Sequence, residues 1–204
     1  FQLFVQSEQS AYGVANHYKV PLWSDEHFRL MDSSFRQLAR LGVSWAYVSV
    51  VTKSELGNRD DVMIKWVRRQ DGSLDFDYSI MDRYLALAKK HFGIPKVVCF
   101  LVMHGTDSNG VFVPILDEAT GRTEMVDVGP DHDATRRPLW RAFARRLYDH
   151  MKGLGMAKSM YWGQAFDDVP DKSLVTLLAE ATPGVYWTGA AHGRGPDETF
   201  RIGS

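Results

Sequence analysis

Cysteine is almost absent from this 204-residue chain, which contains only Cys99. A single cysteine cannot form an internal disulfide, so the sequence offers no covalent cross-link to support the fold. Its surroundings, KVVCFLV, predict a small buried apolar side chain rather than a reactive thiol. The redox state of the protein's compartment therefore does not follow from the sequence.

The chain also lacks a long hydrophobic run and an excess of charge of either sign. No apolar stretch approaches the roughly 18 residues of a membrane span. The 24 basic and 25 acidic residues leave a formal net charge of −1, without the basic excess of nucleic-acid-binding domains. We therefore expect no nucleic-acid partner and no membrane insertion, and the oligomeric state is left open. The chain begins with Phe1 and without the basic segment of a signal peptide, so we expect a fragment of a longer chain.

Hydrophobic residues make up 45% of the chain, which is enough to form one core. This composition predicts a single domain over residues 1–204. Apolar stretches predict strands over 1–8, 43–51, 96–105, 159–164 and 184–190. Amphipathic stretches predict helices over 24–42, 79–92, 137–155 and 171–181, and residues 9–23 are expected to form a polar loop.

The helix over 24–42 has the clearest pattern. Ser24 is a suitable N-cap, and Gly42 suits the end of the helix. Its apolar residues recur at spacings of three and four, which gives one apolar stripe formed by Phe28, Met31, Phe35, Leu38 and Leu41.

The alternation of strands and helices predicts an α/β fold with a parallel sheet. Either a doubly wound open sheet or a part of a TIM-type (β/α)8 barrel fits this order. No G-x-G-x-x-G turn follows the first strand, which counts against a dinucleotide-binding sheet. Two long excursions, 52–78 and 106–137, each contain a predicted hairpin and follow a strand, as inserted loops at the active end of a barrel do. We therefore favour an incomplete (β/α)8 barrel with long inserted βα loops.

Polar and aromatic residues follow the ends of the predicted strands. Carboxylates, amides and imidazoles can hydrogen-bond to many hydroxyls, and an indole can stack on a sugar ring, so this set favours a carbohydrate ligand. The expected substrate-binding residues are Glu8, Lys53, His104, Gln164, Trp187 and His192.

Most of these residue types also have a purely structural interpretation. Aromatic residues on buried strands, such as Trp45, Tyr47 and Tyr161, belong to the core more often than to ligand sites. For Lys53 a solvated loop residue is an equal alternative, and for His104 and His192 a structural histidine is an equal alternative. The segment Asp131-His132-Asp133 has no further ligands at a recognisable spacing, so we expect no metal and no cofactor.

Two adjacent carboxylates, Asp167 and Asp168, follow the strand in SMYWGQAFDDVPD (159–171). Helix capping is the structural alternative, but Asp171 is already placed to cap the next helix. Adjacent residues that leave a strand point in different directions, so one can orient a substrate while the other reaches the leaving oxygen. We therefore interpret Asp167 and Asp168 as a catalytic pair.

Several longer stretches resemble the catalytic domain of glycoside hydrolase family 123. They are KVPLWSDEHFRLMDSSFRQLARLG, VTKSELGNRDDVMIKWV, LDFDYSIMDRYLALAKKHFGIPKVVCFLV and the strand that ends in FDD. The resemblance implies a barrel, often within a longer secreted chain with a flanking β-domain, that acts on N-acetyl-β-galactosaminides. It also implies a substrate-assisted mechanism, in which an Asp orients the 2-acetamido group and an adjacent Glu protonates the leaving oxygen.

By position, Asp167 would be that Asp, and Asp168 stands where the family has Glu. Because Asp is one methylene shorter, an acid at this position has a reach about 1 Å too short, and such a misplacement can cost on the order of 100-fold in rate. A non-catalytic carbohydrate-binding barrel and an unrelated α/β enzyme therefore stay open as alternatives. The resemblance implies a secreted or periplasmic location.

Overall fold

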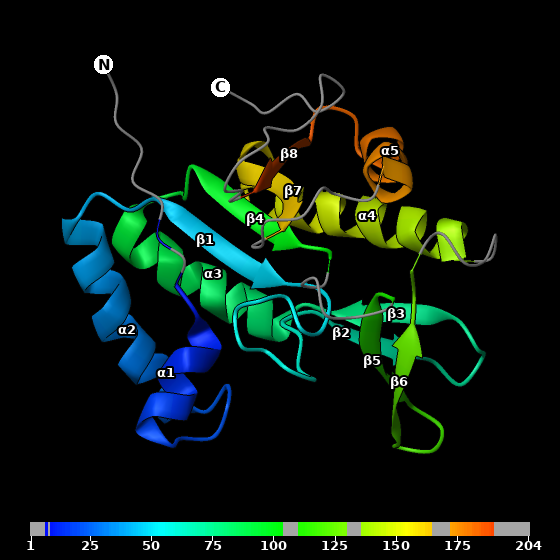
Figure 1. The fold of residues 1–204 in the computed structure, drawn as a ribbon, viewed down its shortest axis with the longest axis horizontal. Helices are drawn as coiled ribbons and strands as arrows, with labels where there is room; N and C mark the ends of the chain where they lie inside the picture. The colour runs from blue at the N-terminus through cyan, green and yellow to red at the C-terminus, as the bar shows by residue number, and fades with distance from the viewer. Residues whose placement is uncertain (1–6, 8, 104–109, 130–135, 165–171, 190–204) are drawn as a thin grey trace.

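The computed structural model describes residues 7, 9–103, 110–129, 136–164 and 172–189 (Figure 1). Its helices are α1 (Ala11–Tyr18), α2 (Asp25–Arg40), α3 (Ser79–Phe92), α4 (Arg136–Gly153) and α5 (Lys172–Ala181), with a 3-10 turn at Ala157–Ser159. Its strands are β1 (Trp45–Ser49), β2 (Lys65–Arg68), β3 (Leu74–Asp77), β4 (Val97–Leu101), β5 (Phe112–Asp117), β6 (Thr123–Asp127), β7 (Met160–Gln164) and β8 (Tyr186–Gly189). None of the described helices combines the length and the apolar character that a membrane crossing requires.

The first sheet has the order β1-β4-β7-β8, and every neighbouring pair is parallel. The strands therefore lie side by side in the order in which they follow one another along the chain. A doubly wound sheet reverses its order at a switch point, and this sheet does not. The predicted strands over 43–51, 96–105, 159–164 and 184–190 are confirmed, while the one over 1–8 lies almost entirely outside the described residues.

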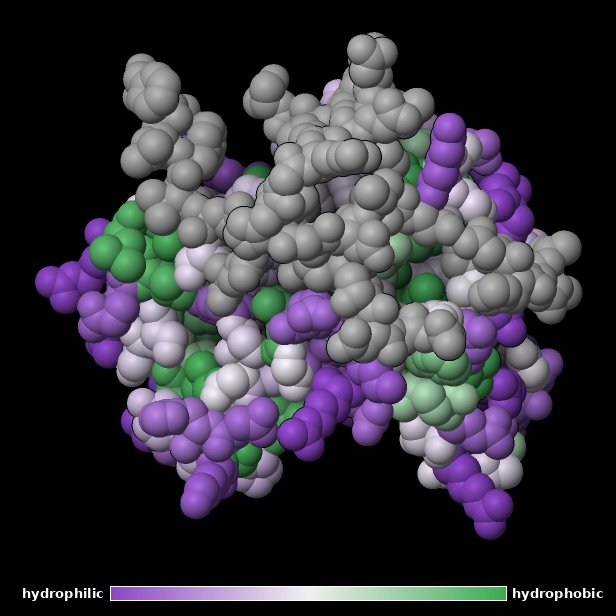
Figure 2. Space-filling view, in the orientation of Figure 1, coloured by the Kyte–Doolittle hydropathy of each residue, from purple (hydrophilic) through white to green (hydrophobic). Residues whose placement is uncertain are grey.

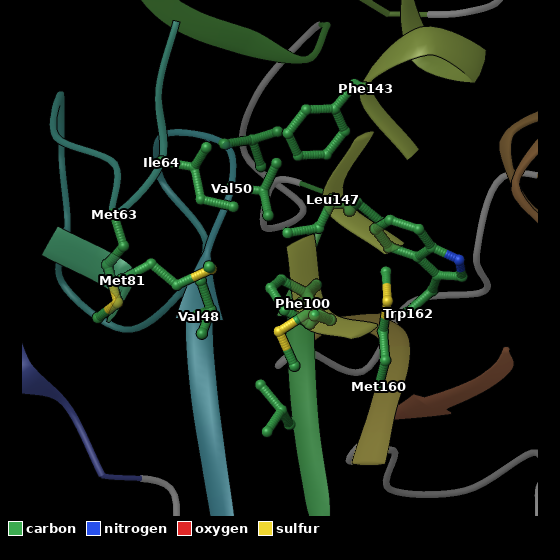
Figure 3. Packing of buried hydrophobic residues seen from close by; sticks show 14 of the residues in the cluster. Val48, Val50, Met63, Ile64, Met81, Phe100, Phe143, Leu147, Met160 and Trp162 are labelled. Carbon is green, nitrogen blue, oxygen red and sulfur yellow. The ribbon is translucent and has the colours of Figure 1, made fainter. Parts of the chain in front are cut away.

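Among the described residues, helices pack against one face of this sheet. The strands contribute Ala46, Val48, Val98, Phe100, Met160 and Trp162 to the main core, and the helices contribute Met31, Phe35, Met81, Tyr84, Phe143, Leu147, Leu174 and Leu177. Figure 3 shows how these side chains from β1, β4, β7 and α4 meet. The opposite face holds a separate small cluster without helical residues, formed by Tyr47, Leu56, Cys99 and Leu101. Helices on one face and sequential strand order are the arrangement of a barrel wall.

The (β/α)8 barrel that the sequence favoured is confirmed only as an α/β fold with a parallel sheet. Among the described residues, β1 and β8 are the edges of an open four-stranded sheet. A (β/α)8 barrel closes with eight tilted strands, so the four described strands of this sheet do not complete one. The described structure is therefore a mixed α/β fold with one open, singly wound parallel sheet.

The second sheet contains the two predicted hairpins and has the order β3-β2-β5-β6. Its β2–β3 and β5–β6 pairs are antiparallel, as hairpins require, and β2 and β5 join the two hairpins in parallel. Figure 1 shows this sheet beyond the arrowhead of β1. The indole of Trp66 on β2 stacks on Phe143 of α4, with ring centroids 5.0 Å apart, so the second sheet shares the main core.

Helix α1 corrects the prediction of a polar loop over 9–23. Ser10 is the N-cap and accepts a hydrogen bond from the backbone N–H of Gly13, and Ala11, Tyr12 and Ala15 are buried. The ring of Tyr12 meets that of Trp23 edge to face at 5.3 Å. A helix of eight residues is too short to be stable alone, so these tertiary contacts, which the sequence pattern does not show, decide its formation.

Gly163 permits the close approach of β7 and β8. A Cβ atom at this position would overlap the Thr188 carbonyl oxygen and would lie 2.5 Å from the Sγ of Cys99. Cys99 is fully buried, as the sequence predicted, and burial raises the pKa of its thiol. Cys99 is therefore a packing residue of the helix-free face.

The described surface is largely hydrophilic. Figure 2 shows apolar residues only in small groups on the visible face, apart from the parts drawn in grey. The large apolar side chains with the most exposure are Tyr18, Leu22, Leu41, Ile94, Met125 and Tyr186, and they come from different elements. Most of the apolar side chains are therefore inside, where they hold the strand ends in place.

Candidate functional site

The carboxyl ends of β1, β4 and β7 lie level with one another. Backbone hydrogen bonds continue past the strands, from Val50 N–H to the Leu101 carbonyl and from Val102 N–H to the Gly163 carbonyl, each at 3.1 Å. The loops that follow these strands therefore start from one edge of the sheet. In barrels of parallel strands this edge carries the active site.

The predicted site residues divide into those that the structure describes and those that it does not. Glu8, His104, Asp167, Asp168 and His192 lie outside the described residues, so their roles stay predictions. The three others are described: Lys53, Gln164 and Trp187.

Gln164 and Trp187 lie on β7 and β8 and are almost completely buried. Gln164 ends β7 with 3% of its surface exposed. Trp187 has 7% exposure and belongs to the main core, where it pairs in register with Trp162. The structure therefore supports a core role for Trp187, and a contact between its indole and a sugar stays a prediction.

Lys53 lies in the loop after β1 and is exposed, as expected for a residue that could meet a ligand. The backbone of this loop is unusual, because three non-glycine residues have a positive φ: 52° at Lys53, 68° at Glu55 and 36° at Arg59. Gly57 adds a fourth at 79°. Each non-glycine residue in this region costs on the order of 1–2 kcal/mol, so surrounding contacts must hold the loop in this shape.

Asn58 supplies those contacts from inside the loop, where 2% of its surface is exposed. Its Oδ1 accepts hydrogen bonds from the backbone N–H of Ser54 at 2.8 Å and from the Ser54 hydroxyl at 2.9 Å. Its Nδ2 donates to the carbonyls of Val51 and Asp61, both at 2.8 Å. The Ser54 hydroxyl also lies 3.1 Å from that of Ser49 at the end of β1. One amide therefore fixes the path of the whole loop relative to its strand.

The same loop is tied to the second excursion. The backbone N–H of Thr52 donates to the carbonyl of Phe112 at 3.0 Å, and its hydroxyl donates to the same oxygen at 3.2 Å. Phe112 begins β5, so the loops after β1 and β4 are held together at the carboxyl edge. This link brings two long insertions to one place, as a shared binding site requires.

Asp61 is a titratable residue of this region that the sequence did not single out. Its Oδ1 accepts a hydrogen bond from the Trp23 indole N–H at 3.0 Å. Burial raises the pKa of its carboxyl, although the hydrogen bond from the Trp23 indole and the nearby Tyr12 hydroxyl oppose this shift. Burial and the nearby charge of Asp61 also raise the pKa of the Tyr12 hydroxyl, which has no hydrogen bond of normal geometry.

Helix α1 and the loop before α2 bring these aromatic partners to Asp61. His27 is fully buried and accepts a hydrogen bond from the Trp23 backbone N–H through Nδ1, so its Nε2–H donates to the carbonyl of Ala11. Burial lowers the pKa of His27 and so favours this neutral form. Little in the sequence indicates this cluster, because its members, Tyr12, Trp23 and Asp61, lie far apart along the chain.

The model of the catalytic domain of glycoside hydrolase 123 matches residues 9–193. The chain belongs to glycoside hydrolase family 123. The matched range includes the β1 loop, both hairpins and the segment with Asp167 and Asp168. No curated protein matches the chain.

A solved structure of a family 123 glycoside hydrolase from Clostridium perfringens, from a study of glycolipid glycan hydrolysis, has a similar fold. The TM-score is 0.68 with 16% sequence identity, and the match covers 87% of this chain. At this identity the likeness concerns the fold alone. The chain corresponds to 31% of that structure's length.

Metal ligands do not gather in the described part of this family 123 chain. No group of three or more His, Cys, Asp or Glu side chains with metal-site geometry occurs among the described residues. Asp131, His132 and Asp133 lie outside them.

We expect Asn58→Asp to destabilise the protein by about 2–4 kcal/mol, because the Val51 and Asp61 carbonyls lose their donor and a charge is buried. Urea denaturation followed by circular dichroism measures this change. Asn16→Asp is the matched control, since Asn16 is exposed on α1, and it should change stability by less than about 0.5 kcal/mol. Equal stabilities of the two variants would show that Asn58 does not hold the loop.

Proposed function

We propose that this chain hydrolyses a β-N-acetylhexosaminide of the galactosaminide type with assistance from the substrate's own acetamido group. The observation that carries the proposal is the family match over 9–193, which includes two adjacent carboxylates directly after β7. The family match supports glycoside hydrolase activity on a carbohydrate substrate, which is the broader part of the proposal. The sugar, the linkage and the mechanism are its more specific part.

In the proposed reaction, the acetamido oxygen attacks the anomeric carbon while the bond to the leaving oxygen breaks. Asp167 orients the acetamido group and stabilises the positive charge of the resulting oxazolinium ion. Asp168 donates its proton to the leaving oxygen. As a carboxylate, it then accepts a proton from the water that attacks the anomeric carbon and opens the oxazolinium ring. Both attacks occur at the anomeric carbon, so the product retains its configuration.

We further propose that the described sheet is one part of a (β/α)8 barrel. Its sequential strand order and its helices on a single face support this, and the resemblance to family 123 implies such a barrel. By the same resemblance we propose a secreted or periplasmic location, which cell fractionation with an antibody against the protein tests.

A matched pair of substrates tests the mechanism. We expect hydrolysis of 4-nitrophenyl N-acetyl-β-galactosaminide and little or none of 4-nitrophenyl β-galactoside, because only the first carries the attacking acetamido group. Proton NMR of the early product should show the β-anomer. Because the Clostridium perfringens enzyme was studied with glycolipid glycans, such glycans belong in the substrate panel.

Two results would contradict the proposal. Equal turnover of both aryl glycosides would exclude participation of the acetamido group. Binding of N-acetylgalactosamine without turnover of any glycoside would favour the non-catalytic carbohydrate-binding alternative, which the Asp at position 168 in place of Glu specifically suggests.

A further inference from the structure

A surface cavity lies between the β2–β3 hairpin and helix α4. Its volume is about 460 Å³, within the range of small-molecule sites. Its walls come from the β2–β3 hairpin, the start of α3 and the second half of α4. The described residues at the strand ends, Thr52, Met103, Gln164 and Thr188, do not line it. The cavity therefore does not include the described part of the candidate active site.

One wall of this cavity is a rigid aromatic surface. The rings of Tyr78 and His150 are stacked, with centroids 4.2 Å apart and planes inclined by 21°. His150 Nε2 lies 2.7 Å from Oδ1 of Asp82, which fixes the orientation of the imidazole. These rings are already in place without a ligand, so little entropy is lost when one binds.

A second wall carries oriented hydrogen-bonding groups. The Asp75 carboxylate bridges two guanidinium groups, with contacts to Arg69 Nε at 3.1 Å and Arg146 Nη1 at 3.2 Å. Arg146 Nη1 also donates to the Leu74 carbonyl at 3.0 Å. The Nε and Nη2 groups of Arg146 donate to no described residue, and 53% of this side chain is exposed. Contacts through Nη1 therefore fix the Arg146 guanidinium, and its Nε and Nη2 groups are left to donate to a ligand.

The charges of the lining favour a neutral ligand over an anion. Arg69 and Arg146 are opposed by Asp75 and Asp149 within the cavity wall. Arg69 is further paired with Glu118 at 2.7 Å outside the wall. A phosphate would therefore meet guanidinium groups whose charge is already compensated, and nearby carboxylates would repel it. Donors and acceptors beside an aromatic surface instead match a hydroxyl-rich ring.

We propose that this cavity, formed by the β2–β3 hairpin and α4, is a secondary carbohydrate-binding site that holds a sugar unit of the glycan away from the bond that is cleaved. The inference rests on the proposed function only in taking a glycan as the ligand. Because no proposed catalytic residue lines this cavity, a sugar bound there increases the affinity for extended glycans without changing the chemical step.

A chemical-shift titration with free N-acetylgalactosamine at millimolar concentrations tests the proposal on the ¹⁵N-labelled protein. We expect shifts of the backbone amides of Tyr78, Arg146 and His150. Arg146→Gln removes the guanidinium Nε and Nη2 donors and should weaken binding at these amides by about tenfold. Arg145→Gln is the matched control, because Arg145 is exposed on the same helix and does not line the cavity, and it should leave binding unchanged.

The outcomes separate this inference from the proposed function. Shifts at the cavity in a protein without turnover would support the secondary site and contradict the proposed hydrolysis. Turnover without shifts at Tyr78 and His150 would support the hydrolysis and overturn the secondary site. If inorganic phosphate shifts these amides more strongly than the sugar, and Arg146→Gln abolishes that effect, the cavity is an anion site and the proposal is wrong.

Discussion

Replacing Asp167 with Asn is expected to lower kcat on 4-nitrophenyl N-acetyl-β-galactosaminide by about 10²–10³-fold, with little change in substrate binding. The substitution keeps the size of the side chain and removes the charge that stabilises the oxazolinium ion. That charge stabilises the transition state much more than the bound substrate. The value of kcat therefore falls, while the Kd changes little. Steady-state kinetics together with calorimetric titration of the product measure the two effects separately.

Asp171→Asn is the control for this experiment, because the sequence predicts Asp171 to be the N-cap of the helix after β7. Asn is as good a cap as Asp, so this change should leave kcat within about twofold. An equal loss of kcat in both variants would mean that the acidic segment supports the loop structure and carries no chemistry. The helix-capping interpretation would then be preferred.

Asp168→Glu extends the same prediction to the proposed acid. The added methylene restores the reach that the family's Glu provides, so turnover should be preserved or increased. Asp168→Asn, which cannot donate the proton, should lose most activity on substrates with poor leaving groups and less on activated aryl glycosides. An Asp168→Asn variant as active as the wild type would remove Asp168 from the mechanism.

The second large effect is expected in the core, where Trp66→Ala should destabilise the protein by about 3–5 kcal/mol. Trp66 is fully buried on β2, stacks on Phe143 and meets Phe76 and Trp140 edge to face at 4.9 and 6.0 Å. Removal of the indole leaves a large cavity between the second sheet and α4. Urea denaturation monitored by far-ultraviolet circular dichroism gives the change in free energy of unfolding.

Trp66→Phe is the matched variant, because it keeps a ring against Phe143 and removes an indole N–H that is buried without a hydrogen-bond partner. Its cost should stay below about 1.5 kcal/mol. Both variants should unfold in one transition, since the second sheet shares the main core. Two separate transitions would show that the second sheet is an independent unit that does not stabilise the first.

Local sequence signals were sufficient for most individual elements. Helix α3 has the predicted bounds Ser79–Phe92, and α2 begins after Ser24, whose hydroxyl accepts a hydrogen bond from His27 N–H. Both hairpins formed within the predicted excursions. Caps, turn residues and apolar periodicity act over a few residues, which is why the sequence alone predicts them.

The candidate site was predictable only in outline. The sequence placed Lys53 after β1 and Gln164 at the end of β7, where the structure has them, because the end of a strand is known once the strand is recognised. It did not reveal that Trp187 packs in the core or that Asp61 meets Trp23, since both facts depend on partners far along the chain. The roles of Asp167 and Asp168 rest on the family pattern.

The sequence by itself determined the alternation of strands and helices, the buried Cys99 and the family resemblance, all of which are properties of local pattern or of residue order. Only the tertiary structure decided that α1 is a helix, that the parallel sheet is open and singly wound, and that the two hairpins join through β2 and β5. The β2–β5 pairing matches Trp66 with Ile115, and Arg146 reaches Asp75 from α4. Such contacts form only when the core brings distant segments together, because no local signal specifies which of several exposed strand edges will pair.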